Sequence, residues 1–520
     1  MKAFLMFRDT DVDNDAKGAM NEAELTEDLE LTTLLTAMAS GDPFLLRVAR
    51  QALLGSLTDQ HVIRYRQDVL RDWLAQPALL HDLYDLAVQA VVGEHEVYPG
   101  GIFRSPETTL HRSVTVLELF LELLTKLRSI ADDHTGTIRS DGLTQFFSML
   151  IKELDDDYFR EIRTHLRHLR FRDGVLISAD LGPELAGRAY TLRKPLEDRR
   201  TWFERLTIKG PARFTYTVSE RDEAGLRSLS ELRNRGIDLV ADALAQSTDH
   251  ILSFFTMMRA ELGFYLACVN LHDQLRARSL PTCFPEPLAP DTPMLTCRAL
   301  YDPCLALRTD RPVAGNDVNA RARALIMITG ANQGGKSTFL RSVGVAQLML
   351  QAGMFAPAES FESSLCSGIF THYPREEDLT MTSGKLDEEL GRMSAIVDHA
   401  AAHSLILCNE SFAATNEREG SEIARQITLA LIESRIRVVF VTHLFELAHG
   451  LYVRRRDDAL FLRAPRDTEG RRSFQLIEGE PLPTSFGRDL YDQIFPATPA
   501  WSGSDASGTW SPHASPSTEG

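Results

Sequence analysis

The stretch Leu325-Ile326-Met327-Ile328-Thr329-Gly330-Ala331-Asn332-Gln333-Gly334-Gly335-Lys336-Ser337-Thr338 decides how the second half of this chain folds. It begins with an apolar run of strand length, continues with glycines and ends where the helix-forming residues 339–350 begin. This is the pattern G-x-x-x-x-G-K-[S/T] with a strand before it and a helix after it. The alternative, a chance glycine-rich turn, does not require both flanking elements. The stretch therefore predicts a phosphate-binding loop.

The residues of this loop have separate expected roles. Glycines let successive backbone N–H groups face a phosphate, and the helix N-terminus adds partial positive charge. Lys336 is expected to reach the β- and γ-phosphates of ATP, and the Ser337 hydroxyl to bind Mg²⁺. We expect nucleotide contacts from Gly330, Ala331, Asn332, Gln333, Gly334, Gly335, Lys336, Ser337 and Thr338.

Two further apolar runs end in polar residues that suit the same chemistry. Residues 404–408 lead into Asn409 and Glu410, and residues 438–441 lead into Thr442 and His443. Apolar runs that alternate with helical stretches predict a parallel sheet flanked by helices, which brings these ends to one edge. Glu410 is the candidate base that orients water, and His443 is the candidate contact to the γ-phosphate. Asn409 offers Mg²⁺ a neutral amide oxygen, so we expect weak hydrolysis.

The chain before the loop is expected to be mainly helical. Proline and glycine mark its breaks, and an apolar stripe at three- and four-residue steps predicts a long helix over residues 236–276. Runs at 174–178, 188–192 and 214–218 predict strands. We divide the chain into an acidic, solvated leader (1–27), a helical region (28–280) with a strand-containing insertion (171–220), a proline-rich linker (281–299), the α/β domain (300–495) and a disordered tail (496–520).

Composition limits the classes of partner. The formal net charge is −17, so any contact with DNA requires a local basic surface. The best candidate is Arg160, Arg163, Arg167 and Arg170, whose spacing places them along one helix face; a solvated face paired to nearby acidic residues is an equally good interpretation. Six cysteines without CxxC spacing, and no apolar span long enough to cross a bilayer, favour a cytoplasmic protein without membrane contact.

Together these motifs resemble the ATPase domain of the MutS family of DNA mismatch-repair proteins, which belongs to the ABC ATPase class. Residues 329–338 are similar to the family's T-G-x-N-x-G-G-K-S-T, and Thr442-His443-Leu444-Phe445-Glu446-Leu447 to its T-H-x-x-E-L. Gly353-Met354-Phe355-Ala356-Pro357-Ala358 resembles G-x-x-V-P-A, and Asn316-Asp317-Val318 resembles N-D-V. The resemblance implies a helical core and lever followed by an α/β P-loop ATPase domain.

The resemblance also implies how the protein works. ATPase domains of the family pair, and a signature serine of the partner completes each site; here that role falls on Ser383, where Ser383-Gly384-Lys385-Leu386 stands for S-G-R-S-T-F. The family's D-E is Asn409-Glu410. We expect a homodimer that binds mismatched or branched DNA and hydrolyses ATP to open and close. Because the helical region begins within about thirty residues of Met1, we do not expect the family's mismatch-wedging domain.

Two other functions stay open on sequence alone. Asn409 and the altered signature segment also suit an ATP-sensing interaction module with little hydrolysis. A chromosome-organising or transport ATPase of the ABC class is the third possibility, although long coiled-coil arms and membrane spans are not found in the sequence.

Overall fold

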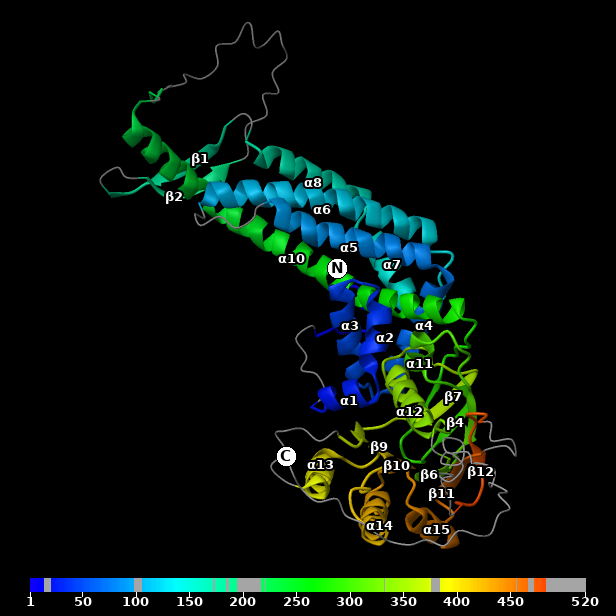
Figure 1. Ribbon diagram of the computed structural model, residues 1–520. Coiled ribbons are helices and arrows are strands. Elements are labelled where there is room, and N and C mark those ends of the chain that lie inside the picture. Colours follow the sequence, from blue (N-terminus) through cyan, green and yellow to red (C-terminus); the bar gives the residue numbers. More distant parts are fainter. Residues whose placement is uncertain are drawn as a thin grey trace, which may run out of the picture.

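The structure is a computed structural model with a long helical arm and an α/β domain (Figure 1). It describes residues 1–13, 20–97, 105–171, 174–183, 187–193, 217–219, 221–331, 333–375, 384–454, 456–465 and 472–482. Helices near the N-terminus pack where the arm meets the α/β domain. The tail expected at 496–520 lies outside the described residues.

The arm is built from helices that run side by side. They are α5 (Pro77–Val97), α6 (Pro106–His134), α7 (Asp141–Glu153), α8 (Asp156–Leu169) and α10 (Glu223–Ala277). Serine or aspartate caps the start of α6, α7, α8 and α10 by accepting a backbone N–H, which is why these helices begin where they do. The helix expected over 236–276 therefore starts thirteen residues earlier, at Glu223, directly after the Asp222 cap.

Helix α10 forms the core of the arm. Among the residues that the structure describes, it is the one helix long and apolar enough to cross a membrane by length and composition, and 67% of its most apolar window is buried inside the protein. Phe255 on α10 packs against Phe120 on α6, with ring centroids 5.6 Å apart. Its apolar side chains are thus used in packing against neighbouring helices.

Two strands lie at the far end of the arm. Strands β1 (Leu176–Leu181) and β2 (Gly187–Arg193) pair antiparallel, close to the runs expected at 174–178 and 188–192. Most of the third expected strand, 214–218, lies outside the described residues, and residues 217–218 are not in a strand.

Four short helices connect the arm to the α/β domain. They are α1 (Glu22–Asp28), α2 (Leu31–Ala39), α3 (Pro43–Leu54) and α4 (Gln60–Ala75). Arg66 on α4 is buried and donates to the carbonyl of Ala352 at 3.2 Å, directly after α12 of the α/β domain. The two parts are therefore joined by buried polar contacts.

The leader expected to be solvated is partly buried. Leu5 is fully buried; its N–H donates to Glu261 Oε2 at 2.5 Å, and its carbonyl accepts from the Tyr265 hydroxyl at 2.6 Å. Both partners lie on α10. The apolar residues at the start of the chain explain this difference, because they contribute to the core despite the acidic residues that follow.

The main sheet of the α/β domain has the strand order β12-β11-β6-β10-β9-β8. All neighbouring strands are parallel except β12 and β11. The strands are β6 (Leu325–Gly330), β8 (Ile369–His372), β9 (Leu405–Asn409), β10 (Arg437–Val441), β11 (Ala459–Ala464) and β12 (Ile477–Glu478).

Helices cover both faces of this sheet. Ile326 and Ile328 face the core shared with α12 (Lys336–Gln351), whereas Leu325 and Met327 face the core formed with α13 (Lys385–His399), α14 (Glu417–Glu433) and α15 (Phe445–Val453). Alternate residues of a strand point to opposite faces, so a sheet buried on both sides requires continuous apolar strands.

The segment expected to be a linker contains strands. A second sheet has the order β3-β7-β4-β5, from β3 (Glu286–Leu288), β4 (Leu295–Leu300), β5 (Asn316–Asn319) and β7 (Ser360–Ser364), with α11 (Pro303–Arg308) between β4 and β5. Pro287 lies in β3, which is an edge strand, where a missing N–H costs no ladder bond. The prolines thus indicated edge and turn positions within a sheet, not an unstructured connection.

Candidate functional site

The glycine loop, residues 330–338, joins β6 to α12 at the carboxyl edge of the main sheet. Gly330 and Gly335 have φ of +108° and +89°. A Cβ on Gly330 would lie 2.7 Å from the carbonyl oxygen of Ala464 on the neighbouring strand, so the position requires glycine. The strand, loop and helix expected from the sequence are all present. Asn332 lies outside the described residues.

Lys336 is the first residue of α12 and is buried. Its ammonium donates to the carbonyls of Gly330 and Ala331 at 3.1 and 3.2 Å. Burial lowers the pKa of Lys336, and the carboxylate of Glu410 opposes that change. The loop thus holds its cation among its own backbone groups, close to the end of β9.

Ser337 and Asn409 are in direct contact. The Ser337 hydroxyl donates to Asn409 Oδ1 at 2.8 Å, which joins the start of α12 to the end of β9. Two hard oxygen donors therefore lie next to each other at this edge of the sheet. Adjacent ligands of an octahedral Mg²⁺ lie about 2.9 Å apart, so this pair fits the ion in donor type and spacing.

Glu410 and His443 bind each other. Glu410 Oε2 accepts from the His443 backbone N–H at 2.9 Å and lies 2.6 Å from His443 Nδ1. Strands β9 and β10 are parallel neighbours, and the Glu410 N–H donates to the Val441 carbonyl at 2.8 Å, which keeps both side chains at one edge. The sequence placed the two residues near each other but did not predict their contact.

This contact changes the pKa of both groups. Burial by itself raises the pKa of Glu410, but the hydrogen bond to His443, with the charges of His443 and Lys336, brings it below the ordinary value. The hydrogen bond to Glu410 raises the pKa of His443, against the effect of burial. Glu410 is therefore held as a carboxylate next to a histidine that gains a proton more easily.

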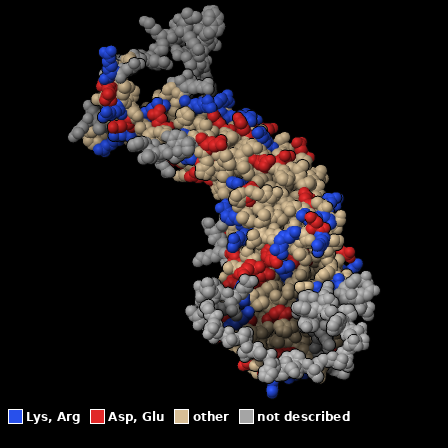
Figure 2. Space-filling view, viewed as in Figure 1, with Lys and Arg blue, Asp and Glu red and all other residues tan. Residues whose placement is uncertain are grey.

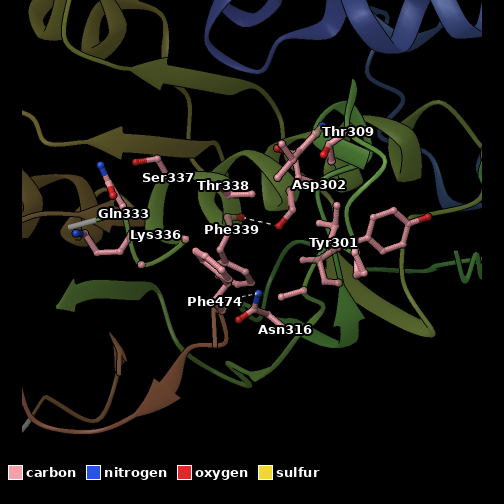
Figure 3. Close-up of a pocket in the computed structure, with 18 of the residues that line it drawn as sticks. Tyr301, Asp302, Thr309, Asn316, Gln333, Lys336, Ser337, Thr338, Phe339 and Phe474 are labelled. Atoms are coloured by element: carbon pink, nitrogen blue, oxygen red, sulfur yellow. Dashed lines mark hydrogen bonds between the residues drawn. The ribbon is translucent and has the colours of Figure 1, made fainter. Parts of the chain in front are cut away.

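A cavity of about 450 Å³ lies beside the glycine loop (Figure 3). Residues 333–339 line one side, and Tyr301, Thr309 and Asn316 come from the second sheet and its connections. Phe474 is half-exposed, and its carbonyl accepts from Asn316 Nδ2 at 3.4 Å. Arg472 donates to Gln333 Oε1 at 2.8 Å, which holds this segment over the loop.

Sequence reasoning missed most of this cavity. Thr309, Asn316 and Phe474 are far from the loop in the chain, and no local pattern relates them to it. Asn316 belongs to the motif Asn316-Asp317-Val318, but its contact with Phe474 depends on how β12 and β5 are brought together. Ser383 lies outside the described residues, and Gly384 caps α13 immediately after it.

The arginine row on α8 forms part of a groove. A groove of about 780 Å³ between α6 and α8 is lined by Arg128, Arg160, Arg163 and Arg167, and basic side chains lie among acidic ones on the arm (Figure 2). Arg160 pairs with Asp157 at 2.7 Å, whereas no carboxylate partner of Arg163 or Arg167 is found in the described part of the chain.

Arg170 does not belong to this groove. It follows the end of α8, pairs with Glu118 and lines a different cavity, so the expected row of four is a row of three joined by Arg128 from α6. The helix ends at Leu169, and the regular spacing stops there.

Comparisons with known proteins cover most of the described chain. Residues 58–278 match the family model of the MutS2 N-terminal domain, and residues 326–486 match that of MutS domain V. The chain is 29% identical over 250 residues to MutS protein homolog 4 of Mus musculus, which is 46% of this chain and 25% of that protein.

Bacterial proteins are similar over a comparable length. The DNA mismatch repair protein MutS of Thermus aquaticus is 29% identical over 282 residues, covering 51% of this chain and 33% of that protein. That of Thermus thermophilus is 30% identical over 266 residues, covering 48% and 31%. The chain thus spans a quarter to a third of the length of these curated relatives.

Proposed function

This chain belongs to the MutS family, and from that premise we propose that it is an ATP hydrolase of DNA repair whose nucleotide state controls how it holds DNA. The observation that carries the proposal is the sheet edge at which the glycine loop, Lys336 and Glu410 meet. In this arrangement a cation, a loop of backbone N–H groups and a carboxylate face one small region. That is what transfer of a phosphoryl group to water requires.

The glycine loop binds the triphosphate in this proposal. Its N–H groups, including those of Ala331, Asn332, Gln333 and Thr338, surround the phosphates, and Lys336 turns from its own carbonyls to the β- and γ-oxygens. The adjacent cavity receives the base, for which Phe474 offers a half-exposed ring as a stacking surface.

Ser337 and Asn409 hold Mg²⁺. Their two oxygens are neutral, so we expect weaker metal binding than an aspartate at position 409 would provide. When bound, the ion neutralises charge on the β- and γ-phosphates.

Glu410 orients the attacking water and accepts its proton. The water oxygen bonds to the γ-phosphorus as the bond to the β–γ bridging oxygen breaks, and ADP leaves with that electron pair. His443 stabilises the carboxylate form of Glu410 and has Nε2 for the γ-phosphate.

DNA binds along the arm in this proposal. Arg163 and Arg167 form no ion pair with a carboxylate among the described residues, and they line the groove between α6 and α8 together with Asp156 and with Asp132, which pairs with Arg128. Contacts between these two unpaired arginines and phosphates neutralise the DNA backbone and do not read sequence. We further propose a cytoplasmic homodimer, paired through the α/β domains, in which Ser383 of one copy completes the other copy's site.

The experiment that tests the hydrolase is steady-state ATP hydrolysis with and without duplex and branched DNA. We expect turnover by the wild type, stimulation by DNA, loss in Lys336→Ala and no change in Lys152→Ala, which removes an exposed lysine of the arm. Absence of turnover by the wild type, with and without DNA, would overturn the proposal.

A second candidate function rests on Asn409. An amide at this position suits a protein that binds ATP and changes its partner contacts with little hydrolysis. Nucleotide binding and nucleotide-dependent dimerisation without phosphate release would favour this interaction module over the hydrolase.

A further inference from the structure

The segment from Glu410 to Phe412 has positive φ angles at two residues that are not glycine. Glu410 has a φ of +52° and Phe412 a φ of +63°. Ser411 and Phe412 are almost completely buried. Left-handed non-glycine residues persist where their surroundings hold them. The contacts that hold this segment therefore determine where the Glu410 side chain points.

The first contact comes from His372, the last residue of β8. Its Nδ1 lies 2.7 Å from Ser411 Oγ, and its ring stacks on Phe412 with centroids 5.4 Å apart. The Ser411 hydroxyl is also 3.0 Å from the carbonyl of His372. Strands β8 and β9 are parallel neighbours, which places His372 directly behind the segment that follows Glu410.

The second contact comes from Glu389 on α13. Its carbonyl accepts from His372 Nε2 at 3.0 Å, and burial raises the pKa of its carboxyl group, an effect that the nearby backbone N–H of Phe412 opposes. Glu389 is 2% exposed. One residue of α13 thus binds the histidine that supports Ser411 and lies close to the backbone of Phe412.

These partners determine the state of His372. A carbonyl accepts only, so Nε2 carries the proton of the neutral ring, and the one proton of the Ser411 hydroxyl lies between two acceptors, Nδ1 and the His372 carbonyl. Burial lowers the pKa of His372 to about 4, which agrees with a neutral ring. The contacts of His372 are buried inside the domain, unlike the partly exposed pair of Glu410 and His443.

We propose that His372 and Glu389 are positioning residues that hold Glu410 for attack by water and make its position depend on helix α13. Gly384 caps α13, which begins at Lys385, so a contact made by this N-terminal end would reach Glu410 through Glu389. The inference rests on the proposed hydrolysis of ATP, because it assigns Glu410 a reacting partner.

The test removes the Ser411 hydroxyl in one variant and the Glu389 side chain in another. The variants are Ser411→Ala, Glu389→Ala and Glu389→Gln, whose amide keeps an oxygen near the Phe412 N–H. The matched control is Ser421→Ala, because Ser421 is also buried and its Oγ has no hydrogen-bond partner among the described residues. Each variant is assayed for kcat, KM, affinity for a fluorescent ATP analogue and thermal unfolding.

We expect kcat to fall about 10- to 100-fold in Ser411→Ala and Glu389→Ala, with KM and analogue affinity unchanged, since a small misplacement of a reacting group has effects of this size. Glu389→Gln should recover most of the rate. The two alanine substitutions combined should lower kcat less than the product of their separate effects. A loss of rate no larger than in Ser421→Ala, or a parallel loss of affinity and thermal stability, would overturn the proposal.

Hydrogen exchange separates this inference from the hydrolase itself. The amide of Phe412 should exchange faster in Ser411→Ala and Glu389→Ala than in the wild type and in Ser421→Ala. If the wild type shows no turnover, the proposed hydrolysis fails, and unchanged exchange at residues 410–412 would then overturn the positioning role as well.

Discussion

The two charged regions of this molecule are built in opposite ways. At the sheet edge, Lys336 and Glu410 are largely buried, and each alters the pKa of the other. In the groove between α6 and α8, Arg160, Arg163 and Arg167 are exposed to solvent. Buried charges interact strongly, whereas water screens exposed ones. Single substitutions should therefore have large effects at the sheet edge and small effects in the groove.

The largest effect is expected for Glu410→Gln. The amide keeps the shape of the side chain but cannot accept a proton from water, so kcat should fall by about 10² to 10⁴ while ATP affinity stays unchanged. Single-turnover hydrolysis and nucleotide titration measure the two quantities. A variant that keeps its rate would remove Glu410 from the reaction and leave the sheet edge as a binding site only.

Gly330→Ala tests the backbone of the same region. The new methyl group would lie 2.7 Å from the Ala464 carbonyl oxygen at a φ of +108°, so we expect a loss of about 2–3 kcal/mol in the free energy of unfolding. Urea unfolding measures it. Gly391→Ala is the control, because its new methyl group would meet no atom within 4 Å beyond the backbone of its own helix and its chain neighbours, and alanine favours helix. Equal stability of the two variants would show that the loop tolerates a side chain.

A smaller effect is expected in the groove. Arg163→Ala with Arg167→Ala should weaken binding to duplex DNA similarly for all sequences and reduce the slope of log K against log salt by about 2. The control, Arg276→Ala with Arg278→Ala, removes two exposed arginines at the C-terminal end of α10, away from the groove. An unchanged slope would mean that the row on α8 is a solvated face.

The smallest effect concerns the pH dependence of the pair formed by Glu410 and His443. The raised pKa of His443 contributes stability that is complete below the ordinary pKa of 6.5 and is lost as pH rises through the pKa of the folded protein. The lowered pKa of Glu410 contributes stability that is complete above the ordinary pKa of 4.5 and is lost as pH falls through the pKa of the folded protein. The pair should therefore stabilise the nucleotide-free protein most between these two values.

His443→Gln measures this contribution. Because the His443 side chain is 47% exposed, we expect a loss below about 1 kcal/mol near pH ~5.5, shrinking toward pH ~9. Urea unfolding of both proteins at the two pH values gives the difference, with His61→Gln, an exposed histidine of α4, as control. A loss that grows with pH would contradict the sign of the His443 shift.

The strands and the glycine loop could be predicted because their patterns are local. Residues 325–338 contain their own strand, turn and helix start, and the apolar runs before Asn409 and His443 required a sheet buried on both faces. The prediction of a linker at 281–299 was wrong because an edge strand tolerates Pro287 as readily as a loop does. Nothing in the local sequence distinguishes these two environments.

The sequence by itself determined the long helix of the arm, the strands of the main sheet around the glycine loop, and the candidate residues at the ends of β9 and β10, because backbone geometry and burial impose short-range patterns on the chain. Tertiary structure alone decided that Glu410 binds His443, that Phe474 lies beside the glycine loop and that Glu389 lies close to Phe412. Each of these contacts joins residues that are distant in the chain. Their directions depend on how strands and helices pack, which no local pattern records.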